Sequence, residues 1–169
     1  MDLKETNAML EEIRSEPHFF RECLNRRQEL TKDFVRLFLS RPIKRIYFSG
    51  SGSPSHAGIV LKYAAEKLLH VEATSSYPML FNNHEGLNAG GNYKPDVMAL
   101  ICPAESGRSK GAVLTARMAR AQAIPVICTT LNPHGVLARE CDVVLVKPTG
   151  KEEALPSTKG HSVGIFILL

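Results

Sequence analysis

Three short segments of the sequence combine serine or threonine with small or turn-forming residues, and together they could bind an anion. They read GSGSPS at residues 50–55, AESGRS at residues 104–109 and LPST at residues 155–158. Serine and threonine hydroxyls donate hydrogen bonds to phosphate oxygens, and glycine lets the backbone approach a ligand closely. These residues could therefore bind a phosphate group, provided that the fold brings the segments together.

The first segment lies between an expected strand and an expected helix. Ile46, Tyr47 and Phe48 are the β-branched and aromatic residues that a central strand prefers. After the glycines, Ser53 is a natural N-cap and Pro54 suits the first helical position. Apolar residues then recur at helical spacing, namely Ala57, Val60, Leu61, Ala64, Ala65 and Leu68. The free N–H groups and the positive dipole end of such a helix suit phosphate, although a plain strand-to-helix turn would need the same glycines and cap.

The chain beyond this unit continues to alternate apolar strands with helices. Further strands are expected at residues 71–75, 97–102, 125–129 and 142–146, and further helices at residues 111–123 and from Ser157 to the C-terminal end. This alternation predicts an α/β fold, a three-layer αβα sandwich with a five-stranded parallel sheet of the flavodoxin-like or Rossmann-like kind. Ligands bind at the carboxyl ends of the strands in such sheets. The three segments should therefore converge on one edge.

Residues 1–40 are expected to form a helical arm in front of the sheet. A helix over residues 3–14 should break at Ser15-Glu16-Pro17, where Ser15 would cap a second helix that runs to about Ser40. A single domain then occupies residues 41–169, with its last helix cut short. The apolar faces of residues 19–38 and 165–169 expose too much nonpolar surface for a monomer, so we expect a homodimer or a larger homo-oligomer.

Composition and charge narrow the classes of function. The formal net charge of +4 comes without a basic cluster, so we expect no nucleic-acid partner. The four cysteines are scattered without a CxxC pair, which predicts reduced thiols rather than a zinc site or disulfides. No signal-peptide core and no apolar run of membrane-spanning length is present, so we expect a cytoplasmic protein without membrane contact. We also expect no metal and no cofactor.

The three segments, in this order, resemble motifs of the sugar isomerase (SIS) domain family. GSGSPSHAG at residues 50–58 is similar to the family's Gly- and Ser/Thr-rich loop, AESGRS to its S-x-S-G-x-T loop, and LPSTKGHS at residues 155–162 to its V-A-S-T-K-A-x-T segment. A helical arm with a broken E-I-x-x-x-P, here Glu12-Ile13 and Pro17, is also typical. The resemblance covers nearly the whole chain. It points to the first SIS domain of fructosamine-6-phosphate deglycases and of the isomerase half of glutamine-fructose-6-phosphate aminotransferase.

The resemblance implies a sugar phosphate as the ligand and a set of residues that hold it. The implied substrate-binding residues are Gly52, Ser53, Glu105, Ser106, Gly107, Ser109, Leu155 and Ser157, with Ser51, Ser55, Arg108 and Thr158 as further candidates. Two departures remove hydroxyl donors, because Pro54 and Ala104 stand where the family has serines. A third departure is Glu105, whose carboxylate would repel phosphate unless Arg108 or Lys110 neutralised it.

For function, the resemblance implies the N-terminal half of a sugar-phosphate isomerase, deglycase or aminotransferase of amino sugar metabolism. The catalytic residues are then expected in a second domain absent from this chain, and we assign none here. The alternative is a non-catalytic regulatory module that senses a sugar phosphate. A dinucleotide-binding domain agrees less well with the sequence. Gly50-x-Gly52 precedes Glu72 at the usual spacing of about 20 residues, but Ser55 replaces the third glycine and Glu72 lies near the start of its strand.

Overall fold

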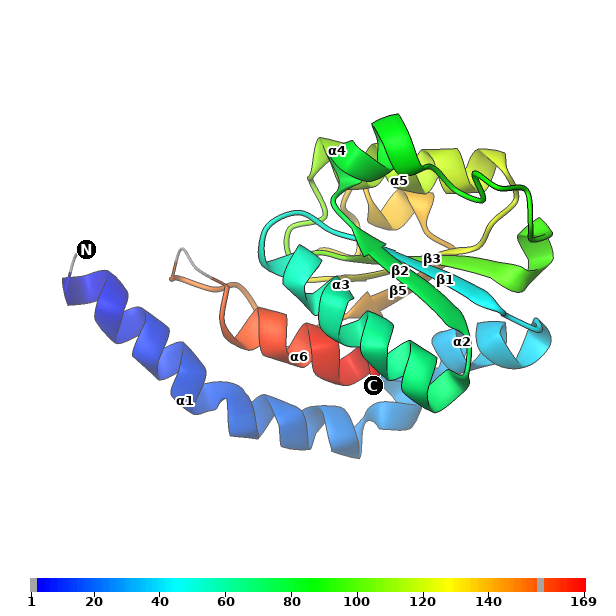
Figure 1. Ribbon diagram of the computed structural model, residues 1–169. Helices are drawn as coiled ribbons and strands as arrows, with labels where there is room; N and C mark the ends of the chain where they lie inside the picture. The colour runs from blue at the N-terminus through cyan, green and yellow to red at the C-terminus, as the bar shows by residue number, and fades with distance from the viewer. Residues whose placement is uncertain (1–2, 155–156) are drawn as a thin grey trace.

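The computed structural model, which describes residues 3–154 and 157–169, contains one parallel sheet (Figure 1). Its five strands lie in the order β2-β1-β3-β4-β5, and every neighbouring pair is parallel. The strands are β1 (Arg45–Ser49), β2 (Glu72–Ser76), β3 (Met98–Pro103), β4 (Val126–Thr130) and β5 (Val143–Val146). This strand order is that of flavodoxin-like folds. The predicted fold class is therefore confirmed, and each strand lies within one residue of its expected position.

Helices cover both faces of the sheet (Figure 1). One face carries α4 (Pro78–Leu80), η2 (Phe81–Glu85), α5 (Lys110–Ala121) and η4 (Ala138–Glu140); the other carries α3 (Ser53–Ala64), its continuation η1 (Ala65–Leu69), α6 (Lys159–Leu168) and the arm. A short turn, η3 (Pro95–Val97), precedes β3. Strand side chains alternate between the layers, so Tyr47 packs towards α5 whereas Ile46 and Phe48 pack towards α3. Strands β3 and β4 are buried along their whole length, as inner strands covered on both faces should be.

The arm differs from the prediction at Pro17. One helix, α1 (Leu3–Asn25), runs through this proline, and the break falls before α2 (Arg27–Ser40). Ser15 does not cap a helix here; its hydroxyl donates to the Glu12 carbonyl oxygen at 2.6 Å. A proline inside a helix removes one backbone hydrogen bond. The helix continues because α1 is held along α6 by polar contacts before the proline and by an aromatic contact after it.

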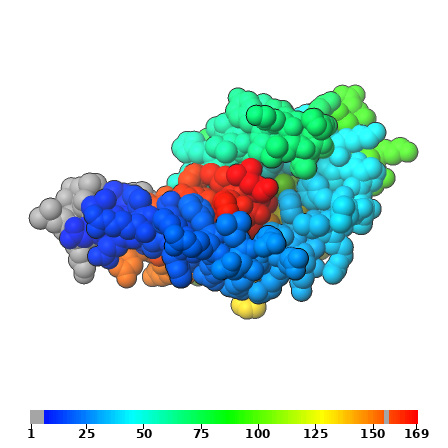
Figure 2. All heavy atoms as spheres, turned by 90° about the horizontal axis from the view of Figure 1, so that it is seen from below, coloured from blue at the N-terminus to red at the C-terminus, as the bar shows by residue number. Residues whose placement is uncertain are grey.

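The aromatic face of the arm is partly covered within the chain. Figure 2 shows α6 lying between α1 and α3 on this side of the molecule. Phe20 contacts Phe166 with ring centroids 4.9 Å apart, and Phe34 and Phe38 pack against the same core. The expected apolar face is therefore partly covered by α6 and the sheet, whereas Leu24 and Val35 of the arm and Leu169 at the end of the chain remain exposed. Exposed large apolar side chains also lie on α3, η1 and the region of α4, namely Ile59, Val60, Tyr63, Leu68, Leu69, Tyr77, Met79 and Leu80.

Two further expectations concern the thiols and the membrane. The four cysteines are unpaired, and Cys23, Cys102 and Cys128 are buried. Burial raises the pKa of the Cys102 thiol far above its ordinary value, so this thiol stays protonated. In the part of the chain that the structure describes, no helix has both the length and the apolar character needed to cross a membrane.

Candidate ligand-binding site

The loops that follow β1 and β3 meet at one point of the sheet edge. Because β1 lies between β2 and β3, this point is the topological switch point, where open α/β sheets bind their ligands. The Oγ atoms of Ser51 and Ser109 lie 3.2 Å apart and join the two loops by a hydrogen bond. Ser109 is the N-cap residue of α5, but its hydroxyl faces Ser51 instead of capping the helix. The N-termini of α3 and α5 are therefore brought together here.

Gly52, not Ser53, is the N-cap residue of α3. Its φ of +69° suits glycine, and its carbonyl oxygen accepts hydrogen bonds from the Ser55 N–H at 2.9 Å and from the Ser55 hydroxyl at 2.7 Å. Ser53 is the first helical residue, and Pro54 follows it within the first turn. The capping role predicted for Ser53 is therefore wrong. Its side chain is half-buried in the first turn of α3 instead.

The loop after β3 is fixed to its neighbours by backbone contacts. The Glu105 carbonyl oxygen accepts hydrogen bonds from the Leu131 N–H at 2.9 Å and from the Thr130 hydroxyl at 3.1 Å. The Gly107 carbonyl oxygen accepts one from the Leu137 N–H at 3.0 Å. Gly107 has a φ of +65°, and a Cβ added to it would lie 3.2 Å from the Thr130 Oγ1 atom. The turn therefore requires glycine.

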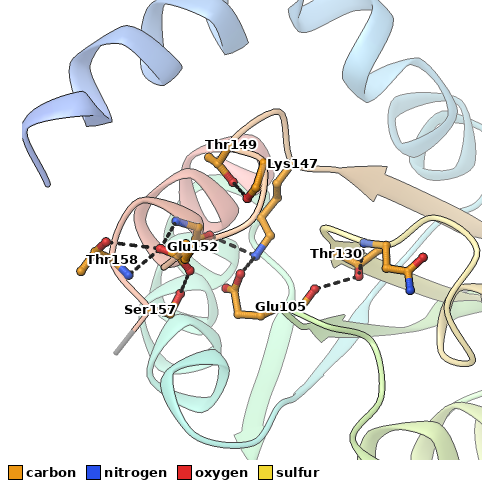
Figure 3. Close-up of polar contacts among 10 residues, drawn as sticks. Glu105, Thr130, Lys147, Thr149, Glu152, Ser157 and Thr158 are labelled. Atoms are coloured by element: carbon orange, nitrogen blue, oxygen red, sulfur yellow. Dashed lines mark hydrogen bonds and ion pairs between the residues drawn. The ribbon is translucent and has the colours of Figure 1, made fainter. Parts of the chain in front are cut away.

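A buried ion pair lies behind this loop (Figure 3). The Glu105 carboxylate pairs with the ammonium group of Lys147, whose side chain is 1% exposed and which directly follows β5. The ammonium also donates to the Gly160 carbonyl oxygen at 3.1 Å. Burial lowers the pKa of Lys147 below its ordinary value, against the attraction of Glu105, which raises it. The sequence left open whether Arg108 or Lys110 neutralises Glu105. Both of these residues are exposed, and the partner is Lys147.

The Glu152 carboxylate caps the N-terminus of α6 (Figure 3). It accepts hydrogen bonds from the N–H groups of Thr158 at 2.8 Å and Gly160 at 3.1 Å, and from the Ser157 hydroxyl at 2.8 Å. Burial alone would raise the pKa of Glu152, but these hydrogen bonds outweigh it, and the pKa lies below its ordinary value. The prediction that Ser157 caps this helix is wrong, because α6 begins at Lys159 and its N-cap residue is Thr158.

The predicted site residues fall into groups along this edge. Ser51, Gly52, Ser53 and Ser55 lie at the start of α3, whereas Glu105, Ser106, Gly107, Arg108 and Ser109 precede α5. Of the second group, Ser106 and Arg108 are exposed to solvent, and Gly107 is buried. Ser157 and Thr158 lie beside α6, where their hydroxyls face carboxylates. Leu155 lies outside the residues that the structure describes.

Sequence reasoning missed Lys147 and the capping role of Glu152. Lys147 directly follows an apolar strand, so its position at the carboxyl edge of the sheet could have been predicted. Its burial could not, because an isolated lysine in a loop is ordinarily solvated. Glu152 stands in a pair of glutamates between lysines, a pattern typical of exposed loops. Only the folded chain shows that Glu152 is half-buried against α6 while Glu153 is exposed.

Glu72 lies at the opposite edge of the sheet from these loops. It is the first residue of β2, and its carboxylate pairs with the Arg45 guanidinium at 3.0 Å. A ribose-binding acid would stand at the carboxyl end of its strand. The geometry therefore disfavours the dinucleotide-binding alternative.

The strand order and the meeting of the loops after β1 and β3 define an α/β domain with a topological switch point at this edge. The SIS domain family pattern matches residues 41–168, and the chain belongs to this family. The glutamine–fructose-6-phosphate aminotransferase [isomerizing] of Symbiobacterium thermophilum is 26% identical over 167 residues, which cover 95% of this chain and 26% of that protein. The same enzyme of Clostridium tetani is 27% identical over 173 residues, with coverage of 95% and 27%. The chain thus spans about a quarter of the length of these curated relatives.

Solved structures share the fold at lower sequence identity. The C-terminal domain of glucosamine-fructose-6-phosphate aminotransferase from Francisella tularensis has a TM-score of 0.79 at 20% identity, covering 95% of this chain and 45% of that one. The Vibrio vulnificus NanR protein complexed with ManNAc-6P has a TM-score of 0.67 at 20% identity, covering 90% and 57%. The fold of this chain is therefore that of SIS proteins along almost its whole length.

Proposed function

We propose that this chain binds a sugar phosphate where the loops after β1 and β3 meet. The observation that carries the proposal is the contact between Ser51 and Ser109, which brings the N-termini of α3 and α5 to one point. Two helix N-termini offer two positive dipole ends to an anion, although at α3 Pro54 has no N–H group and the Ser55 N–H donates to Gly52. The names of the relatives specify fructose 6-phosphate and ManNAc-6P, which supports a sugar phosphate over other anions.

Within this site, the phosphate group belongs at α3 and α5 rather than at α6. The Glu152 carboxylate already occupies the N-terminus of α6, and a second anion there would meet a like charge. Hydroxyls of Ser51, Ser53 and Ser109 stand at the other two helix ends. We therefore assign the phosphate group to these serines. We assign the sugar to the part of the carboxyl edge of the sheet that lies nearer α6.

Glu105 is the residue that we assign to the sugar. The Lys147 ammonium offsets its charge, so this carboxylate repels a nearby phosphate less than an unpaired one would. The Glu105 side chain is 23% exposed. Its exposed part can accept a hydrogen bond from a sugar hydroxyl or amino group. A paired carboxylate in this position is therefore compatible with a phosphorylated ligand.

In the whole protein, we assign this chain to the N-terminal half of a sugar-phosphate isomerase, deglycase or aminotransferase of amino sugar metabolism. Residues 41–169 are the binding domain, and residues 1–40 are its arm. A chain that spans about a quarter of its curated relatives is compatible with one part of such an enzyme. Unpaired cysteines support a cytoplasmic location. The exposed apolar side chains of α3 and of the α4 region support a homodimer.

The second candidate is a non-catalytic module that senses a sugar phosphate. The ionisable carboxylate nearest the proposed sugar position, that of Glu105, is engaged by Lys147 rather than free for proton transfer. This pairing favours binding over catalysis by this chain alone. Turnover of fructose 6-phosphate by the isolated chain would contradict the second candidate.

An NMR titration of the 15N-labelled chain with fructose 6-phosphate tests the binding site. We expect saturable shifts of the backbone amides of residues 50–53 and 106–110, the segments at the two helix ends. Unphosphorylated fructose, the matched control ligand, should leave these amides unshifted at the same concentration. Shifts confined to other segments, or none at millimolar ligand, would show that the proposed site is wrong.

A further inference from the structure

The buried carboxylate of Glu12 in the arm accepts hydrogen bonds from the loop between β5 and α6. Glu12 of α1 is 6% exposed, although α1 lies on the outside of the molecule (Figure 2). Its Oε1 atom accepts a hydrogen bond from the Glu153 N–H at 2.6 Å, and its Oε2 atom accepts one from the Thr158 hydroxyl at 3.2 Å. We infer that Glu12 is a positioning residue, which orders residues 152–154 and 157–158 from the arm and so sets the affinity of the ligand site.

Polar contacts join the arm to this loop. A surface cavity of about 290 Å³ is lined by both, including Ala8 and Phe19 of the arm and Lys151 of the loop. The contacts of Glu12 lie at the wall of this cavity. A buried carboxylate without hydrogen-bond donors is unfavourable. Glu12 is therefore satisfied by the Glu153 N–H, by the Thr158 hydroxyl and by the ammonium of Lys159 at the start of α6, which lies 3.9 Å from its Oε1 atom.

The Thr158 hydroxyl connects Glu12 to the cap of α6. It lies 3.2 Å from the Glu12 Oε2 atom and 3.3 Å from the Glu152 Oε1 atom, and its single proton can serve only one of them. Glu152 has three other donors, the N–H groups of Thr158 and Gly160 and the Ser157 hydroxyl. The Thr158 proton is therefore available to Glu12.

The same contacts continue to the ligand edge (Figure 3). Gly160 donates its N–H to Glu152 and accepts a hydrogen bond from Lys147 through its carbonyl oxygen. Lys147 in turn pairs with Glu105. Movement of the loop away from the arm would therefore disturb the first turn of α6 and the ion pair. The effect on affinity rests on the proposed function, because it assumes that Glu105 contacts the sugar.

Amide hydrogen exchange of the full chain, followed residue by residue by NMR, tests the ordering without any ligand. Glu12→Ala removes the acceptor of the Glu153 N–H, so we expect this amide to exchange at least about tenfold faster. Glu12→Gln should recover part of the protection, because its amide oxygen still accepts. The matched control is Glu16→Ala, since Glu16 contacts Ser162 on α6 at 3.1 Å and makes no hydrogen bond or ion pair with residues 147–154. It should leave the Glu153 amide unchanged.

Titration calorimetry with fructose 6-phosphate on the same variants tests the effect on affinity. We expect Glu12→Ala to weaken binding roughly tenfold, as the loss of a buried hydrogen bond would, and Glu16→Ala to leave it within about twofold. A Glu153 amide unaffected by Glu12→Ala would overturn the inference. So would equal effects of the two alanine variants, because docking of the whole arm would then hold the loop. Faster exchange with unchanged affinity would overturn the link to the site. A wild type that binds no sugar phosphate would overturn the proposed function and this link with it, whereas the ordering of the loop by Glu12 would still be decided by the exchange measurement.

Discussion

Glu105 and Lys147 form an ion pair that spans the end of β4, from the loop after β3 to the residue after β5. Thr130, the last residue of β4, lies between them. Its hydroxyl donates to the Glu105 carbonyl oxygen at 3.1 Å, and its own carbonyl oxygen accepts the Lys147 N–H at 3.0 Å. Three neighbouring strand ends are thereby held together at the edge that we assign to the ligand.

The ion pair should be visible in a double-mutant cycle of unfolding free energies. Glu105→Gln leaves the 1% exposed Lys147 ammonium without its counter-charge, at a cost of about 2–4 kcal/mol. Lys147→Met leaves a carboxylate that is 23% exposed, and should cost less. The double variant should be more stable than the sum of the single effects predicts. Urea unfolding of the four proteins measures this, and strict additivity would mean that the two side chains do not interact.

The same variants should change affinity for fructose 6-phosphate in opposite directions. Glu105→Gln leaves a net positive charge behind the site and should tighten binding roughly three- to tenfold, as a Coulomb interaction of about 1 kcal/mol would. Lys147→Met leaves a net negative charge and should weaken binding by a similar factor. Calorimetry on folded protein measures both. Changes in the same direction would indicate that loss of structure, not charge, controls affinity.

Glu152→Gln should destabilise the fold by about 0.5–2 kcal/mol, the usual value of a helix N-cap. The pKa of Glu152 lies below its ordinary value of 4.5 in the folded chain. As pH falls, the unfolded chain takes up this proton first. The stability that the carboxylate contributes is therefore complete above pH about 4.5 and is lost as pH falls through the folded pKa.

Thermal unfolding of the wild type and of Glu152→Gln as a function of pH measures this effect. The difference in melting temperature should be constant near neutral pH and should shrink in acid. A difference that stays constant down to pH about 2 would show that the charge of Glu152 plays no part in capping α6.

Gly52→Ala should destabilise the fold through backbone strain, whereas Gly107→Ala adds a steric contact to its strain. Gly52 has a φ of +69° and a ψ of −137°, a region nearly restricted to glycine, so alanine there should cost about 1–3 kcal/mol. Gly107 has a φ of +65°, and an added methyl group would lie 3.2 Å from the Thr130 Oγ1 atom, whereas nothing lies within 4 Å at Gly52. Denaturant titrations measure the loss of stability in each variant. An unchanged stability of Gly52→Ala would show that the N-terminus of α3 can change its backbone, and an unchanged stability of Gly107→Ala would show the same for the loop after β3.

The sheet was predictable because each strand is marked locally. Apolar runs such as residues 97–102 have to be covered on both faces, and their carboxyl ends then share an edge. The predicted helix break at Pro17 was wrong because long-range contacts outweigh a local signal. A proline inside a helix does cost stability, but contacts of α1 with α6, more than a hundred residues further along the chain, keep the helix continuous.

The candidate site was predictable only in part, because some of its contacts join residues that are far apart in the sequence. Hydroxyl-rich loops could be read from the sequence, whereas the partner of Glu105 could not, because it is determined by which strands become neighbours. Arg108 and Lys110 lie nearer in the sequence but extend into solvent, and Lys147 is placed under the loop by β5. Likewise, no local pattern in residues 150–158 indicates that Glu12 reaches this segment.

The most direct measurement of the central claim compares the affinity of fructose 6-phosphate for the wild type and for Ser109→Ala by titration calorimetry. Ser109 makes no capping bond to α5, so the variant should fold normally. We expect it to bind roughly tenfold more weakly, because it loses a hydroxyl donor to a charged phosphate. Ser40→Ala, which changes an exposed serine at the end of α2, is the control and should bind as the wild type does. Unchanged affinity of Ser109→Ala, or equal affinity of the wild type for fructose and fructose 6-phosphate, would contradict a phosphate site at the junction of α3 and α5.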